Sequence, residues 1–343
     1  MEKRHYKNID GLRAICCFGI IAMHIQANTS YEVDGFFYNN IIPSWTLFVY
    51  LFLIISGFAM SCGYFEAFKE GKIDLEKFYI KRYAKILPFF ALLVGLDVIL
   101  ERSKESLFEG IVELTMVYGL LPNNSLNVIG VSWTLGVIFL FYMLFPFFVF
   151  LLKNKRRAWF SFAISIAISY MCEAYFFTDK FVVADFTARH SFLYCVPYFI
   201  CGGIVYLYRE KLYNWINKFA IVQLVISIVI TILFYTTNLI SGTIGMLLLF
   251  ASWLILCIGK DNIILSNKVA KFLGGISMEM YLAHMVIFRL LEKTGVVSLF
   301  GSKWYGYCLV FILTVIILIS FIYCYKFVTQ KINALAKGYG KNS

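Results

Sequence analysis

Ten apolar segments, each long enough to cross or nearly cross a bilayer, dominate this chain of 343 residues. A helix rises about 1.5 Å per residue, so about 20 apolar residues span the roughly 30 Å of hydrocarbon in a membrane. The expected spans are residues 12–28, 45–64, 86–100, 132–152, 158–177, 190–208, 219–237, 241–259, 272–291 and 304–327. Little chain remains between them. We therefore expect an all-α, polytopic membrane protein with about ten transmembrane helices, formed by a single domain over 1–343.

Composition supports a membrane environment. Hydrophobic residues make up 61% of the chain and charged residues 15%, against about 45 to 50% and about 25% in ordinary soluble domains. The chain also holds 35 Phe and 23 Tyr, residue types that gather at membrane interfaces. The third expected span is the shortest, and we expect it to open at Pro88, because proline is tolerated in the first turn of a helix.

The distribution of Lys and Arg predicts the orientation. Both termini and the even-numbered loops hold 23 of the 31 basic residues, and the odd-numbered loops hold seven. Basic residues in short loops stay in the cytoplasm, so we expect both termini to be cytoplasmic. The net charge of +11 is then a topology signal, and no nucleic-acid partner is expected, because that would need a basic stripe on a soluble domain.

Three smaller features complete the outline. The first apolar run follows a basic flank but lacks a clear cleavage site, so we expect it to be retained as a helix. The nine Cys residues lie mostly within spans without a C-x-x-C spacing, which indicates neither a disulfide nor a metal site. The long loop at 101–131 carries Glu109 and Glu113 one turn apart among apolar residues, a pattern typical of a short helix in the outer interface.

The first span contains two ionisable residues, in "DGLRAICCFGIIAMHI" (10–25). Arg13 and His24 are eleven residues apart, which is three helical turns plus about 20°, so they share one face about 16 Å apart. Arg13 has a simpler interpretation as a cytoplasmic anchor, with Asp10 as its partner or the helix cap. His24 lies near mid-membrane, where ionisable groups usually have a function, although a plain hydrogen bond to another helix is the alternative.

A second histidine lies at the same depth in the ninth span. Ser277, Tyr281 and His284 follow an i, i+4, i+7 spacing and lie along one stripe of the helix. His284 is about twelve residues from the cytoplasmic end, which matches the depth of His24. We therefore expect the two imidazoles to share a polar pocket. Glu279 lies off the stripe and has no assigned role beyond a polar contact with another helix.

Five motifs in order resemble the acyltransferase 3 family of bacterial integral membrane acyltransferases. They are the Arg13-to-His24 spacing, "LFLIISGFAM" (51–60), "FYIKRYAKILP" (78–88), "SWTLGVIFLFYMLFP" (132–146) and "ISMEMYLAH" (276–284). The resemblance runs along nearly the whole chain. It implies transfer of an acyl group, commonly acetyl, from acyl-CoA to a hydroxyl of an envelope carbohydrate, in the bacterial cytoplasmic membrane. Acyl-CoA is then a donor substrate, and no tightly bound cofactor is implied.

The resemblance also suggests a donor site. Donor phosphates would rest near Arg13 and Arg82, with Lys85 and Lys81 beside them, because basic groups bind phosphate. Lys85 replaces the second Arg of the family's Arg-x-x-Arg-x-x-Pro element. For Lys81, the positive-inside rule alone is an equally good explanation.

The chemistry is expected at the histidines. His24 would act as general base on the acceptor hydroxyl, and a covalent acyl-histidine relay stays open beside direct transfer. The residues expected to stabilise the oxyanion or to position the acceptor are Tyr281, Ser277 and His284. Trp133 and Arg189, with the neighbouring His190, are expected at the outer ends of their helices, where a sugar would dock.

Two departures from the family pattern keep other functions open. Many relatives carry acidic residues where this chain has Ile138, Phe139 and Leu140, which favours an inactive partner subunit. The family often bears an attached extracytoplasmic esterase-like domain, so a separate extracytoplasmic transferase, or a second copy of this chain, is a further expected partner. A transporter of a lipid-linked sugar is the competing function, although internal repeats are not evident.

Overall fold

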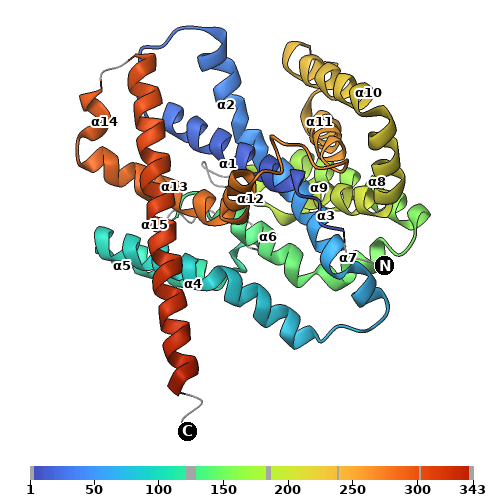
Figure 1. Cartoon of the computed structure of the whole chain (residues 1–343), viewed down its shortest axis with the longest axis horizontal. Helices are drawn as coiled ribbons and strands as arrows, with labels where there is room; N and C mark the ends of the chain where they lie inside the picture. The colour runs from blue at the N-terminus through green and yellow to red at the C-terminus, as the bar shows by residue number, and fades with distance from the viewer. Residues whose placement is uncertain (1–3, 121–128, 183–186, 238, 301–302, 340–343) are drawn as a thin grey trace.

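The computed structural model describes residues 4–120, 129–182, 187–237, 239–300 and 303–339. Every regular element in these ranges is helical, which confirms the all-α class. Figure 1 shows that the last helix, α15 (Trp304–Tyr339), crosses the body of the molecule and that its C-terminal part projects beyond it. The other helices are α1 (Asn8–Ala27), α2 (Ile42–Ser44), α3 (Phe48–Lys69), α4 (Leu75–Glu101), α5 (Lys104–Leu114), α6 (Trp133–Met143), α7 (Phe145–Leu151), α8 (Lys155–Met171), α9 (Phe192–Leu207), α10 (Arg209–Thr236), α11 (Gly242–Leu256), α12 (Lys268–Gly275), α13 (Ser277–Lys293) and α14 (Val296–Leu299).

Apolar helices of membrane-spanning length are consistent with a membrane protein. Among the described residues, six helical stretches are long and apolar enough to cross a bilayer: Asn8–Ala27, Phe37–Lys69, Leu75–Glu101, Lys155–Phe176, Arg209–Thr236 and Trp304–Ile332. The bent pair of α6 and α7 makes up to seven, and α9 and α11 are shorter apolar helices. A helix therefore overlaps each expected segment, while the count of ten crossings and the cytoplasmic termini stay predictions.

Helix α4 starts earlier than its hydropathy suggests. It begins at Leu75 rather than near Pro88, and Pro88 lies inside it. Asp74 caps the helix, since its side chain accepts a hydrogen bond from the backbone N–H of Lys77 at 3.1 Å. The first turns are polar, so a search for apolar runs does not detect them. As a result, the basic residues from Lys81 to Lys85 lie on a helix and not in the loop before it.

The expected span at 132–152 is bent. Helices α6 and α7 meet at an angle of 63°. Pro146 lies in the first turn of α7, where it cannot donate the backbone hydrogen bond that would continue α6. Because of the bend, α6 is a separate short helix, and Trp133 and Thr134 are its first residues.

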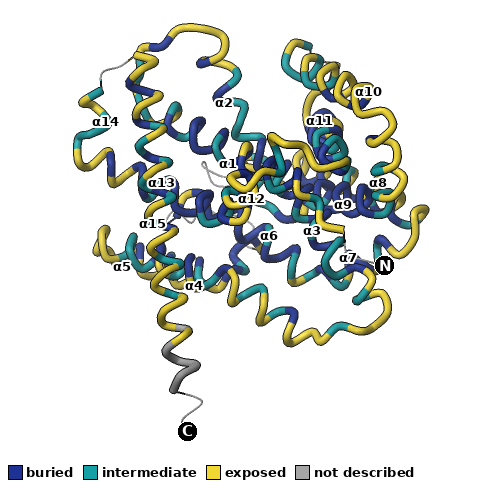
Figure 2. Tube along the Cα trace, in the orientation of Figure 1, coloured by how far each residue is buried: buried dark blue, intermediate teal, exposed yellow. Residues whose placement is uncertain are grey.

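Helix α1, which carries Arg13 and His24, lies at the centre of the fold. Of the candidate spans, α1 is the most enclosed, with 72% of its apolar window buried, whereas α10 is the least, with 11%. Figure 2 shows the same contrast between buried segments of α1, α3 and α9 and the largely exposed α10. Helices α3 and α9 pack closely through Gly57 and Gly202, because a Cβ atom at Gly202 would lie 2.0 Å from the backbone oxygen of Ile54.

We expect Gly202→Ala to destabilise the protein. The added methyl would collide with backbone, which cannot rotate away, so the helices must separate at a cost of about 1–3 kcal/mol. The measurement is thermal unfolding in detergent. Gly95→Ala is the matched control, because no atom lies within 4 Å of a Cβ there and alanine stabilises an open helical position by about 0.5–1 kcal/mol. Equal melting temperatures for the two variants would contradict this account of the α3–α9 contact.

Candidate functional site

The two intramembrane histidines meet inside the helix bundle. His24 is on α1 and His284 is on α13, and their ring centroids are 5.0 Å apart. His284 is only 1% exposed, whereas His24 is half-buried. The pair therefore has one partly accessible imidazole and one enclosed imidazole behind it.

The hydrogen bond of His284 fixes its tautomer. Its Nδ1 lies 2.6 Å from the backbone oxygen of Tyr281. A carbonyl oxygen only accepts, so Nδ1 carries the proton, and Nε2 of the neutral ring keeps a lone pair. Nε2 is buried, and none of the described residues provides it with a hydrogen-bond partner. His284 thus holds an unused acceptor beside His24.

Tyr281 links the histidines to α6. Its ring lies 5.9 Å from that of His284. Its hydroxyl is 2.6 Å from the hydroxyl of Thr134 and donates to the backbone oxygen of Val131 at 3.3 Å. Ser277, one turn before Tyr281 on the same stripe, donates to the backbone oxygen of Gly274 at 2.9 Å. The stripe expected from the sequence is therefore buried and hydrogen-bonded along its length.

A cavity of about 160 Å³ extends from Tyr281 toward the end of α1 that carries Arg13. We call it the Arg13 cavity. Its wall includes Tyr281, Thr134 and Ser277 near the histidines, and Arg13 and Lys85 at the basic end. The cavity thus joins cations from two helices to the polar stripe of α13.

Arg82 lies beside this basic end and is held by aromatic side chains. It donates to the Tyr64 hydroxyl at 2.7 Å, and its guanidinium carbon is 5.8 Å from the centroid of Tyr142, which itself lines the Arg13 cavity. Lys85 lies within electrostatic range of both Arg13 and Arg82. Lys81 is exposed and does not line the cavity. The structure therefore groups three of the four expected donor-site cations.

The side chains expected to hold an acceptor lie close to the histidines. The Arg189 guanidinium lies 5.2 Å from the Trp133 ring and donates to the Thr46 hydroxyl at 2.7 Å. The His190 ring is 5.0 Å from Trp133 on a tilted plane. Arg189 therefore lies next to the Trp133 ring and within electrostatic range of His24.

Apolar side chains occupy the three positions at which many relatives carry acidic residues. At the three positions without the expected carboxylates, Ile138 lines the Arg13 cavity, while Phe139 and Leu140 are buried among apolar residues. This wall of the cavity is therefore apolar.

In the described ranges, no group of three His, Cys, Asp or Glu side chains is arranged to hold a metal ion.

A buried carboxylate that the sequence left without a role lies behind this site. Glu113 is on α5 and is 0% exposed. Its Oε1 accepts hydrogen bonds from the Ser132 hydroxyl at 3.0 Å and from the backbone N–H of Ile129 at 3.3 Å. Because Ser132 directly precedes α6, Glu113 fixes the turn that places Trp133 and Thr134.

Burial raises the pKa of Glu113 to about 7, and its two hydrogen bonds oppose this only in part. Between its ordinary pKa near 4.5 and about 7, the folded protein binds a proton that the unfolded chain does not. The free energy of unfolding therefore falls as pH rises through this window. The loss is complete above about pH 7.

We expect Glu113→Gln to flatten this dependence, because the amide keeps the hydrogen-bonding oxygen and cannot ionise. The wild-type protein should lose up to about 3 kcal/mol between pH 5 and 8 that the variant keeps. The measurement is the melting temperature in detergent across this range. Glu105→Gln, at an exposed position on the same helix, should leave the slope unchanged. Identical slopes for wild type and Glu113→Gln would show that this carboxyl does not titrate in the window.

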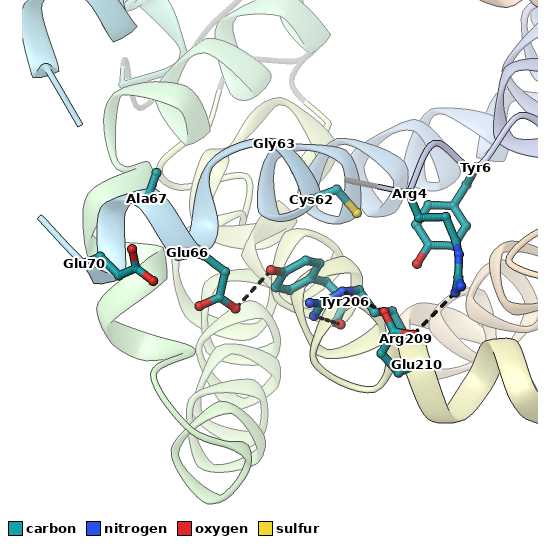
Figure 3. Close-up of a pocket in the computed structure, with 10 residues that line it drawn as sticks. All are labelled: Arg4, Tyr6, Cys62, Gly63, Glu66, Ala67, Glu70, Tyr206, Arg209 and Glu210. Atoms are coloured by element: carbon teal, nitrogen blue, oxygen red, sulfur yellow. Dashed lines mark hydrogen bonds and ion pairs between the residues drawn. The ribbon is translucent and has the colours of Figure 1, made fainter. Parts of the chain in front are cut away.

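A second cavity, of about 390 Å³, lies at the junction of the N-terminal segment, α3 and α9–α10 (Figure 3). It contains several charged side chains, which have polar partners in the surrounding protein. Arg4 pairs with Glu210 at 3.4 Å, and the Tyr206 hydroxyl donates to Glu66 at 3.2 Å. Arg209 donates to the backbone oxygen of Tyr206 at 3.0 Å. These contacts attach the N-terminal segment to neighbouring helices. Neither His24 nor His284 lines this cavity.

Comparison with known proteins identifies the chain's relatives at the family level. Residues 6–323 match the model of one family, which is described as an acyltransferase domain. No curated protein and no solved structure matches the chain. The matched range includes the histidine pair, the Arg13 cavity and the residues around Trp133. It ends shortly before Lys326 on α15.

Proposed function

Because the chain belongs to the acyltransferase 3 family, we propose that it transfers an acyl group, acetyl in the first instance, from cytoplasmic acyl-CoA to a hydroxyl of an envelope carbohydrate. The protein would act in the bacterial cytoplasmic membrane. The observation that carries this proposal is the Arg13 cavity, which connects a cluster of cations to Tyr281. The Tyr281 ring lies 5.9 Å from that of His284, the neighbour of His24. A polyanionic donor with a long, thin thioester arm suits this combination of a basic entrance and a narrow interior.

The proposed donor site uses three cations from two helices. Arg13 on α1 and Lys85 on α4 line the cavity, and Arg82 stands beside them, held by Tyr64. Guanidinium groups bind phosphate through two parallel hydrogen bonds, and ammonium groups add point charges. With the phosphates at this entrance, the pantetheine arm would reach along the cavity toward Tyr281.

In the proposed reaction, His24 is the general base. It takes the proton of the acceptor hydroxyl as that oxygen bonds to the carbonyl carbon of the thioester. The carbon–sulfur bond then breaks, and the CoA thiolate takes up the proton from His24. His284 is assigned the role of a positioning residue, because its ring lies 5.0 Å from that of His24 and its Nε2 lone pair has no partner among the described residues.

The remaining roles follow from position. Tyr281 stabilises the oxyanion of the tetrahedral intermediate in this proposal: its hydroxyl proton would turn from the backbone oxygen of Val131 to the oxyanion, while the Thr134 hydroxyl donates to the Tyr281 oxygen. Trp133 and Arg189 hold the sugar acceptor, because an aromatic face and a guanidinium suit the apolar face and hydroxyls of a sugar ring. Direct transfer is the simplest course, since His24 is the accessible member of the pair and can contact the acceptor.

We expect His24→Ala to reduce CoA release from acetyl-CoA by about 100-fold or more, the usual loss when a general base is removed. The measurement is thiol release by the purified protein in nanodiscs, with and without envelope glycans. His5→Ala is the matched control, because the His5 side chain is 64% exposed and lies outside the bundle. Melting temperatures of both variants show whether the fold is kept.

The result for the wild type decides between functions. A folded His24→Ala protein that releases CoA at the wild-type rate would exclude His24 as the base. If the wild-type protein releases no CoA from acetyl-CoA or succinyl-CoA with any glycan, the acyltransferase proposal fails. A transporter or an inactive partner subunit would then explain the histidine pair.

A further inference from the structure

A carboxylate stands among the cations at the basic end of the Arg13 cavity. Glu279 lies in the first turn of α13 and lines the cavity together with Arg13 and Lys85. Its side chain is only 15% exposed, and its Oε1 is 2.9 Å from the Nζ of Lys326 on α15. The ion pair therefore joins two helices at the place where the donor phosphates are proposed to bind.

Lys326 is held at this place by the packing of α15. The preceding residue, Tyr325, packs its ring 4.9 Å from that of Phe89 on α4, and Phe321 lies 6.1 Å from the same ring. Figure 1 shows α15 crossing α4. Because α15 contacts both α4 and α13, its backbone is fixed near the end of the cavity, while the Lys326 side chain remains 37% exposed.

The local charge balance is strongly positive. Arg13, Arg82 and Lys326 all lie within electrostatic range of the Lys85 ammonium, and Glu279 is the carboxylate that acts on it. Among the described residues, four cations thus surround one carboxylate, although Lys85 is exposed and the Lys326 side chain is 37% exposed. The excess of positive charge is unfavourable by itself, since like charges repel one another. A bound polyanion would relieve it.

We propose that Lys326 is a fourth cation of the donor-phosphate site, and that Glu279 holds it at the entrance of the Arg13 cavity until the donor binds. This inference rests on the proposed acyltransferase function. The CoA diphosphate and phosphomonoester compete with Glu279 for the Lys326 ammonium, which turns toward the stronger anion. Glu279 is therefore a specificity residue that weakens the binding of less charged molecules, because they cannot displace it.

The effects of two substitutions distinguish a phosphate-binding Lys326 from a Lys326 that serves only in a structural ion pair. If Lys326 contacts phosphate, Lys326→Gln raises the KM for acetyl-CoA about tenfold, the usual loss for one charged hydrogen bond, and leaves kcat unchanged. Glu279→Gln has the opposite effect and lowers this KM, because it frees Lys326 and removes a negative charge. If the ion pair is purely structural, both substitutions lower the stability of the folded protein to a similar extent.

The experiment measures KM and kcat in neutral-lipid nanodiscs with two donors, acetyl-CoA and S-acetyl-pantetheine, which lacks the phosphates. The Lys326→Gln effect should vanish with S-acetyl-pantetheine, and Lys326→Arg should restore the acetyl-CoA value. Lys331→Gln is the matched control, because Lys331 lies on the same helix, is exposed and contacts the Phe327 ring. Calorimetric titration of each variant with CoA gives binding constants for the same comparison.

Three outcomes overturn the inference. In the first, the KM of Lys326→Gln for acetyl-CoA does not exceed twice that of Lys331→Gln. In the second, Lys326→Gln raises the KM for both donors equally, and in the third, Glu279→Gln raises the KM for acetyl-CoA. In each of these, the wild-type protein still consumes acetyl-CoA, so the proposed function stands. Failure of the proposed function is visible instead in the wild type, which then neither consumes acetyl-CoA nor binds CoA.

Discussion

The contact between His24 and His284 depends on the enclosure of α1 by other helices. An imidazole facing hydrocarbon lacks partners, and a polar group without partners is costly there. The structure keeps both rings away from hydrocarbon by burying α1 at the centre of the bundle and by placing α13 beside it. The hydrogen bond of His284 Nδ1 to the Tyr281 backbone oxygen satisfies one ring nitrogen. The close packing of α3 against α9 through Gly57 and Gly202 supports the same core. The position of the two rings is therefore a property of the whole bundle.

The polar groups around the histidines form a chain from the loop helix to the bundle core. Glu113 on α5 binds Ser132, the next two residues open α6, and Thr134 contacts the Tyr281 hydroxyl. Each member is buried and gains its hydrogen bond from a different helix, so none is satisfied until the helices are assembled. This arrangement gives a short amphipathic helix outside the candidate spans a direct influence on the geometry of the site.

The sequence predicted the helical class, the family and much of the candidate site. Apolar runs and the motif spacings are local properties, and the helical phase places Ser277, Tyr281 and His284 on one stripe without any tertiary information. The start of α4 was predicted wrongly, because a polar first turn capped by Asp74 leaves no hydropathy signal. Glu113 was found on the expected interfacial helix, but its burial was not predictable, because its partner Ser132 lies 19 residues further along the chain.

The sequence by itself determined that this chain has the apolar segments of a membrane protein, that its regular structure is helical, and that Arg13 and His24 share one helical face. These properties follow from composition and from the fixed geometry of a single helix. Only the tertiary structure decided that Arg13, Lys85 and Glu279 line one cavity. It also decided that Lys326, 47 residues after Glu279 in the chain, forms an ion pair with that carboxylate. The crossing of α15 over α4 and α13 is set by side-chain packing between helices, which no local pattern encodes.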